Sequence, residues 1–405
     1  MRIRAFQGLR PTPDNAPKVA SLPYDVVNTE EARELASGNP LSFLHVVRAE
    51  IDLPDDTDPY SDPVYAKAKE NLESLQSQGG LVRESEPCVF LYRQEMGEHS
   101  QTGLVAVCHI EDYENDIIKK HEKTRKAKED DRTNLNRTLA AHPGPVFLTH
   151  KDEPAIDALT EAAVKTDPLI DFVAPDGVKH TVWRIAGGDD YVEAFKNIPV
   201  AYVADGHHRS ASAARVGKER REANPNHTGD EDYNWFLTVL FPAGQLNILP
   251  YNRVVKDLNG LTEDEFLAKV LESVEVTENA NPSPSKPGEV SLYLGGKWYG
   301  LSFPEDASEG PIESLDVSRL QDKILTPILG IDDPRTSNRI DFVGGIRGTA
   351  ELEKRVNSGE CAAAFSMFET TCDQLMDIAD AGEIMPPKST WFEPKLRSGL
   401  FIHTF

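Results

Sequence analysis

The feature that most constrains the fold is an apolar run at residues 199–204 that leads directly into the polar sequence 205–209. The run has the length and β-branched content of a buried strand. Residues 210–216, which follow the polar sequence, are rich in Ala and Ser and favour a helix. A strand that turns straight into a helix is typical of layered proteins. Because strand and helix patterns also alternate around it, the sequence predicts an α/β, mixed α+β, fold.

The turn between this strand and this helix gathers groups that suit phosphate chemistry. The first N–H groups of a helix have no acceptor within the helix and can bind an anion. Gly206 lets a ligand approach the backbone, and Arg209 can bind two phosphate oxygens at once. His207 and His208 offer groups for proton transfer, and Asp205 can hold Mg²⁺ or a substrate amine. The alternative is a turn whose polar residues only cap the helix.

A second polar segment, residues 119–132, is dense in charge. Its cations are Lys119, Lys120, Lys123, Arg125, Lys126, Lys128 and Arg132. A phosphoryl donor needs such positive charge, and Glu122, which lies among these cations, can act as the base for an acceptor hydroxyl. The alternative is a solvated helix face, which is the usual structure of a charge run.

A zinc site is the obvious rival use of His121, His207 and His208. The segment at His121 lacks the second His of the HExxH pattern, and the adjacent pair His207 and His208 would point in different directions from a strand or helix. The cysteines have no CxxC spacing, which disfavours a zinc ligand set. The P-loop pattern GxxxxGK[ST] does not occur in the chain. A phosphate site of another type is therefore favoured over zinc.

The bulk properties limit the class of protein. A formal net charge of −24 repels phosphate backbones, so we expect no nucleic-acid partner. No run is long and apolar enough to cross a bilayer, and the first residues lack a secretory h-region, so we expect a cytoplasmic protein without a membrane partner. The 405 residues exceed one ordinary core, which predicts more than one domain.

Composition divides the chain into three predicted regions. Residues 1–110 form an N-terminal mixed region, residues 111–245 contain both polar motifs, and residues 246–405 form a C-terminal α/β region. In the last region, the segments 251–253, 341–348 and 387–391 carry polar or Gly-rich turns. Residues 251–253 and 387–391 could face a pocket, but on the sequence alone we favour a structural interpretation of all three turns.

With these motifs in view, the chain resembles the family of proteins designated DUF1015. The stretches that carry the resemblance are residues 8–11, 22–27, 120–124, 204–209, 252–255, 342–345 and 385–392. They run nearly from end to end of the chain, so the resemblance covers most of it.

The central region also resembles the ParB/sulfiredoxin-like superfamily, in which a small α/β unit binds a nucleotide phosphate. Free serine kinases of that superfamily carry an upstream His-Glu and a downstream Asp-Gly-His-His-Arg. This chain has both in that order, as His121-Glu122 and residues 205–209, with 151–198 as an apparent insertion between them. The resemblance implies a ParB/sulfiredoxin-like core at 111–245. Sulfiredoxin activity is disfavoured because the turn has no Cys.

By this resemblance the chain is expected to be a free L-serine kinase. It would transfer a phosphoryl group from ATP or ADP to the serine hydroxyl to give O-phospho-L-serine, with Mg²⁺ bridging the donor phosphates. Glu122 would be the base, and Asp205 and His207 would complete the catalytic group, with Asp205 as the tentative Mg²⁺ ligand. The residues expected to hold the nucleotide phosphates are Gly206, His208, Arg209, Ser210, Arg125, Lys128 and Arg132.

Two alternatives to the kinase stay open. One is a nucleotide-binding, ParB-like switch protein without small-molecule kinase activity. The other is a metal-assisted phosphohydrolase that uses the same His and Asp groups.

Overall fold

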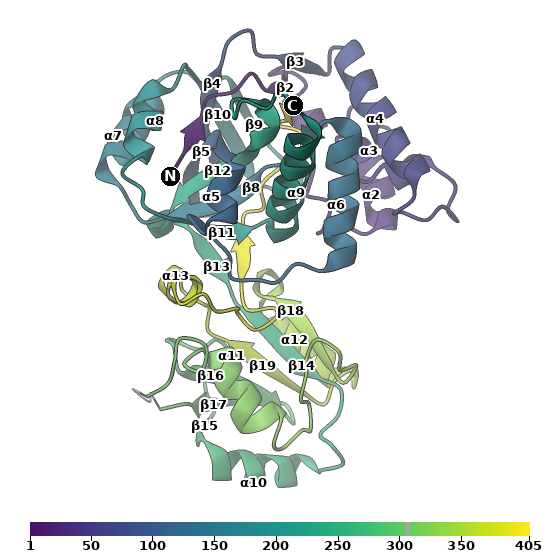
Figure 1. Cartoon of the computed structure of the whole chain (residues 1–405). Helices are drawn as coiled ribbons and strands as arrows, with labels where there is room; N and C mark the ends of the chain where they lie inside the picture. The colour runs from purple at the N-terminus through teal and green to yellow at the C-terminus, as the bar shows by residue number, and fades with distance from the viewer. Residues whose placement is uncertain (305–307) are drawn as a thin grey trace. The chain divides into compact units, whose positions relative to one another are not determined.

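The computed structural model describes residues 1–304 and 308–405, and these residues form two compact units (Figure 1). Unit 1 comprises Met1–Leu246 together with Pro394–Phe405, and unit 2 comprises Asn247–Glu393. The boundary between the units lies next to the sequence-based boundary at 245. The sequence-based division at 110 falls inside unit 1.

A mixed sheet forms the centre of unit 1. Its strand order is β6-β11-β8-β12-β5-β4-β10-β9, and β1 also pairs with β5. The strands are β1 (Ile3–Arg4), β4 (Cys88–Met96), β5 (His99–His109), β6 (Ile118–Lys119), β8 (Val146–His150), β9 (Ile170–Val173), β10 (Lys179–Ala186), β11 (Ala201–Asp205) and β12 (Trp235–Pro242). β6 runs parallel to β11, and β8 runs parallel to β12.

This sheet explains why residues 1–110 and 111–245 share one unit. β4 and β5 come from the first region, whereas β10 and β12 come from the second, and β10 pairs with β4 as β12 pairs with β5. Dividing the chain at 110 would break these ladders and leave unpaired backbone groups at two buried edges. The sequence-based division followed composition, which does not report strand pairing.

Helices cover the sheet of unit 1. They are α1 (Ala16–Val19), α2 (Thr29–Ala36), α3 (Leu44–Val47), α4 (Asp62–Ser77), α5 (Ile110–Glu114), α6 (Lys126–Leu139), α7 (Pro154–Ala163), α8 (Asp189–Phe195) and α9 (His207–Ala223). One core cluster joins apolar strand residues to Ile156 of α7, Phe195 of α8 and Ala213 of α9. α6 and α9 lie side by side (Figure 1), and the Asn136 amide of α6 donates a hydrogen bond of 3.1 Å to Ser212 of α9.

Short strand pairs complete unit 1. β2 (Leu9–Pro11) pairs with β3 (Leu81–Arg83), and β7 (Ala141–His142) pairs with β21 (His403–Thr404). The second pair ties the C-terminal segment to the unit. Phe401 of that segment packs against Phe90 of β4, with ring centroids 5.1 Å apart.

Local sequence signals account for several elements. α2 follows Asn28, whose side chain accepts a hydrogen bond from the Glu31 N–H in a capping box. The predicted strand at 199–204 and the helix after the turn are β11 and α9. The mixed α/β class is therefore confirmed.

Unit 2 is built on a second sheet, with strand order β15-β17-β16-β19-β14-β18. Its strands are β14 (Tyr251–Val255), β15 (Glu275–Glu278), β16 (Glu289–Leu294), β17 (Lys297–Ser302), β18 (Ile340–Gly344) and β19 (Ala363–Met367), and β13 (Asn247–Leu249) pairs with β20 (Trp391–Glu393). Its helices are α10 (Glu263–Ser273), α11 (Asp316–Leu320), a π-helix (Gln321–Leu325), α12 (Gly348–Asn357) and α13 (Cys372–Asp380). Val254, Val343 and Leu352 form part of a core cluster between the sheet and α12.

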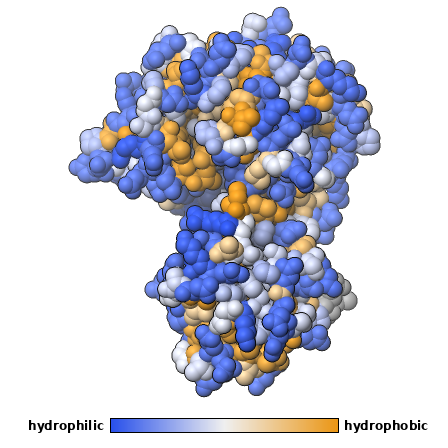
Figure 2. Space-filling view, turned by 180° about the vertical axis from the view of Figure 1, so that it is seen from behind, coloured by the Kyte–Doolittle hydropathy of each residue, from blue (hydrophilic) through white to orange (hydrophobic). Residues whose placement is uncertain are grey.

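The surface is mainly hydrophilic in the view of Figure 2, as the composition predicts. Within the described ranges 1–304 and 308–405, no helix has the length and apolar character needed to cross a membrane.

Candidate functional site

The site is built around the turn that joins β11 to α9. β11 ends at Asp205, and Gly206 follows with φ 100° and ψ 32°. This backbone conformation favours glycine because a side chain would crowd the neighbouring carbonyl. Among the described residues no side chain caps α9, so the N–H groups of its first turn have no side-chain acceptor. The 17-residue helix can therefore receive an anion at its start.

Asp205 lies between two cations. The Lys395 Nζ is 3.4 Å from one carboxylate oxygen, and the Arg209 Nη2 is 3.7 Å from the other. Burial raises the pKa of Asp205, but the charges of Lys395 and Arg209 outweigh it, so the pKa lies below its ordinary value. Asp205 is therefore a carboxylate at neutral pH.

Arg209 is held in one orientation. Its Nη1 donates to the Pro145 carbonyl, while its Nε is buried without a hydrogen-bond partner among the described residues. A buried donor without an acceptor costs free energy unless a ligand or water supplies one. Ser210, by contrast, donates its hydroxyl to the Gly206 carbonyl over 3.0 Å. That hydroxyl stabilises the turn in this structure.

His207, the first residue of α9, contacts His121. Their Nε2 atoms are 3.4 Å apart and their rings meet edge to face, so one Nε2 carries the hydrogen and donates to the other. Burial lowers the pKa of His121 to about 4, although the Asp205 charge opposes the shift. Burial and the His121 charge lower the pKa of His207 well below its ordinary value. Both rings are therefore neutral at pH 7.

The contact between these histidines brings the two polar motifs of the sequence together. β6 pairs in parallel with β11, with Ile118 opposite Ala201, so the chain leaves β6 beside the turn. The Arg125 N–H then donates to the His208 Nε2 over 3.0 Å. Glu122 lies between these two contacts and is exposed, whereas its neighbour His121 is buried. A carboxylate is thus accessible next to the start of α9.

The cations expected around Glu122 occupy different environments. Lys128 donates to the Tyr60 hydroxyl over 2.7 Å. Arg132 is buried, pairs with Asp131 over 2.7 Å and stacks over the Tyr24 ring at 3.9 Å. Both side chains are therefore engaged within the protein. Arg125 is exposed and provides the N-cap of α6.

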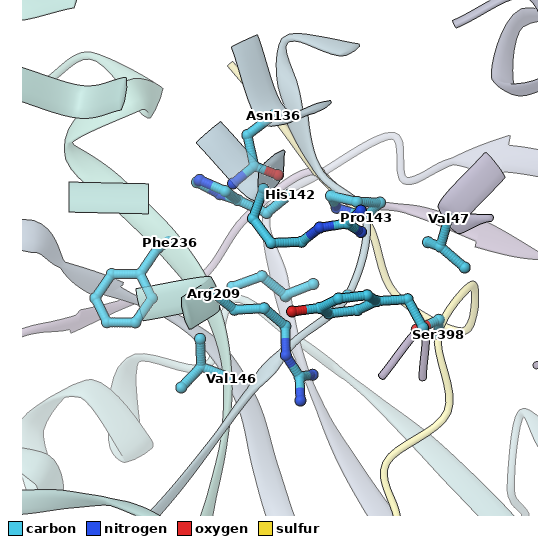
Figure 3. Close-up of a pocket in the computed structure, with 12 residues that line it drawn as sticks. Val47, Asn136, His142, Pro143, Val146, Arg209, Phe236 and Ser398 are labelled. Carbon is cyan, nitrogen blue, oxygen red and sulfur yellow. The ribbon is translucent and has the colours of Figure 1, made fainter. Parts of the chain in front are cut away.

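A narrow cavity of about 20 Å³ lies beside Arg209 (Figure 3). Arg132, Asn136, His142 and Ser398 also line it. Both ring nitrogens of His142 are buried without a hydrogen-bond partner among the described residues, and burial lowers the pKa of His142 well below its ordinary value. The space is enough for about one water molecule. The wall of the cavity is completed by apolar residues that include Val146, Phe236 and Leu237.

The residues at the turn do not fit a resident Mg²⁺ site. Mg²⁺ in proteins is held by carboxylates and water in octahedral geometry, yet the Asp205 carboxylate already faces Lys395 and Arg209. In the described ranges, no three His, Cys, Asp or Glu side chains are grouped to hold a metal ion. The expectation of Asp205 as a metal ligand finds no support in this geometry, in which Asp205 pairs with two cations.

Sequence reasoning missed Lys395. It lies 190 residues beyond Asp205, in the Pro-interrupted segment 385–399. The local sequence carries no signal for the contact, because the contact arises when the C-terminal segment returns to unit 1.

Comparison with family models identifies the chain. The model of DUF1015, a protein of unknown function, matches residues 3–318. The chain therefore belongs to the DUF1015 family, which confirms the resemblance found in the sequence. No curated protein matches the chain.

Solved structures resemble the chain distantly. A free serine kinase in complex with AMP is 13% identical and has a TM-score of 0.38, with 73% of this chain and 91% of that chain covered. SbnI with a C-terminal truncation from Staphylococcus aureus is 10% identical, with a TM-score of 0.38 and coverage of 71% and 82%. A conserved hypothetical protein from Pyrococcus furiosus is 14% identical, with a TM-score of 0.36 and coverage of 73% and 95%. Likeness at this level does not assign an activity.

Proposed function

We propose that this protein is a small-molecule kinase that phosphorylates free L-serine with ATP or ADP as donor. The observation that carries the proposal is that residues 121–125, which include Glu122, lie against the start of α9. His121 contacts His207 at 3.4 Å, and the Arg125 N–H donates to His208 over 3.0 Å. An accessible carboxylate beside an open helix N terminus provides a base and a phosphate site at one place. The match of both motifs to those of free serine kinases points to serine as the acceptor.

The donor phosphates bind at the start of α9. The free N–H groups of the first turn and the Arg209 guanidinium supply hydrogen bonds and positive charge. Mg²⁺ enters with the nucleotide as part of the substrate and neutralises the phosphate charge. The neutral histidines, His121 and His207, fix the turn without adding charge of their own.

The acceptor serine lies between Glu122 and Asp205. Glu122 takes the hydroxyl proton as the serine oxygen bonds to the transferred phosphorus, and the bond from that phosphorus to the leaving phosphate oxygen breaks. Asp205, which is ionised, accepts from the serine ammonium group. Lys395 and Arg209 orient Asp205 from either side.

A product assay tests the proposal. The purified protein is mixed with L-serine, Mg²⁺ and either ATP or ADP, and O-phospho-L-serine is detected by mass spectrometry. We expect the product to accumulate with at least one donor. Folded protein that forms none with either donor would rule out serine as acceptor. Nucleotide binding without turnover would then favour the switch protein, and phosphate release without an acceptor would favour the hydrolase.

A further inference from the structure

Unit 2 contains a buried arginine that has no acidic partner among the residues that the structure describes. Arg253 of β14 is 4% exposed, and among the described residues no carboxylate lies within ion-pair distance of it. The other buried arginines each have one: Arg132 pairs with Asp131, Arg319 with Glu309 and Arg397 with Asp176. Buried charges in proteins are normally paired. In a chain with 67 acidic residues, a buried arginine that no described carboxylate pairs with indicates that another anion belongs there.

The protein holds Arg253 in place through neutral groups. Its Nη1 donates to the Tyr251 carbonyl, and its Nη2 donates to the Lys388 carbonyl over 3.1 Å. The guanidinium lies over the Phe342 ring at 5.4 Å. Burial lowers the pKa of Arg253 to about 9, although Tyr251 opposes the shift, so the group is still charged at pH 7. These contacts orient the charge without neutralising it.

Lys388 brings a second positive charge to the same place. It has φ 57°, a left-handed conformation that few residues other than glycine adopt and that is enriched at functional sites. Its carbonyl accepts from Arg253, while its ammonium group donates to the Tyr251 hydroxyl over 3.3 Å. The Lys388 side chain is exposed and that of Tyr251 is half-buried, so this side of the cluster is open to solvent.

We propose that unit 2 carries a binding site for the phosphate group of a small molecule, formed by the Arg253 guanidinium, the Lys388 ammonium and the Tyr251 hydroxyl. Guanidinium and ammonium groups bind phosphate through charge-assisted hydrogen bonds, and the hydroxyl adds a neutral donor. The site lies wholly within unit 2 and does not depend on the proposed kinase activity of unit 1.

Aromatic rings next to the cluster define the class of ligand further. The Trp391 ring meets the Tyr251 ring with centroids 5.0 Å apart, and the Phe342 ring meets it at 6.3 Å. Such rings give a nucleobase a surface on which to stack. A nucleoside monophosphate should therefore bind more tightly than inorganic phosphate alone.

Calorimetric titration of the whole protein tests this site. All variants carry Arg209→Gln, which weakens the phosphate site proposed in unit 1. Inorganic phosphate and AMP serve as separate probes. Lys388→Gln should weaken phosphate binding about tenfold or more, because it removes a charged donor. Lys297→Gln is the matched control, since Lys297 is exposed on β17 and two strands, β16 and β19, separate it from β14.

The outcomes separate the alternatives. Loss of binding in Lys388→Gln but not in Lys297→Gln supports the site, and Arg253→Lys should weaken binding in the same way if it folds. Equal phosphate affinity in the two lysine variants, or absence of phosphate binding in the Arg209→Gln background, overturns it. If AMP binds more tightly than phosphate, the ligand of the site is a nucleotide. Equal affinities point to free phosphate as the ligand.

Discussion

The buried histidine pair should make unit 1 sensitive to acid, and replacing His121 with Gln should remove part of that sensitivity. His121 is 2% exposed, and its pKa falls from 6.5 to about 4 on burial. The unfolded chain therefore binds a proton at this site over a span of about 2.5 pH units in which the folded protein does not. At about 1.4 kcal/mol per unit, the site contributes up to about 3 kcal/mol of acid destabilisation.

Whether acid raises or lowers the free energy of unfolding depends on which state binds the proton. Above pH 6.5 His121 is neutral in both states and has no effect on the pH dependence of stability. As the pH falls below 6.5, only the unfolded state takes up the proton, so the free energy of unfolding decreases until the pH approaches 4. Gln keeps a polar group near His207 but cannot titrate. His121→Gln should therefore lower the slope of stability against pH by about 1.4 kcal/mol per pH unit.

Urea unfolding between pH 4.5 and 7.5 measures this slope. Trp183 and Trp235 report on unit 1, in a background where Trp298 and Trp391 of unit 2 are replaced by Phe. The reasoning is refuted if His121→Gln and its parent lose stability in parallel as the pH falls, because His121 would then be accessible to protons in the folded state.

Three further changes have defined outcomes. Gly206→Ala should lower the free energy of unfolding by at least ~1 kcal/mol in urea titrations, because φ is 100° and the new methyl would lie 3.1 Å from the Arg209 Nε. Lys395→Gln should raise the pKa of Asp205, because it removes a neighbouring positive charge. The acid limb of the pH profile of kcat/KM in the serine kinase assay should then move to higher pH. If the acid limb does not move, Asp205 takes no part in the reaction. Asn28→Ala breaks the capping box of α2 and should cost about 1 kcal/mol by thermal unfolding; an unchanged Tm would mean that the cap is dispensable.

The sequence predicted those parts of the site that depend on local signals. The β11 strand, the turn at Gly206 and α9 follow from an apolar run, a glycine and a small-residue helix in direct succession. The capping box at Asn28 is likewise a local signal, because it is encoded within four residues.

Contacts between distant segments could not be predicted in the same way. The pairing of β6 with β11, and with it the contact of His121 with His207, joins segments more than 80 residues apart, and pattern alone does not state which strands are neighbours. The buried ion pair of Arg132 could not be predicted for another reason. Asp131 is adjacent in sequence, but only burial of α6 against Tyr24 turns an apparently solvated charge into an internal ion pair.

Turnover and nucleotide affinity of Glu122→Gln, measured together, test the proposed role of Glu122 most directly. Glu222→Gln is the matched control, since Glu222 is an exposed carboxylate at the far end of α9. If Glu122 removes the serine proton, its amide variant should lose at least ~100-fold in serine phosphorylation while nucleotide affinity is kept, and the control should retain both. Serine phosphorylation by Glu122→Gln at the rate of the control would contradict the proposed mechanism.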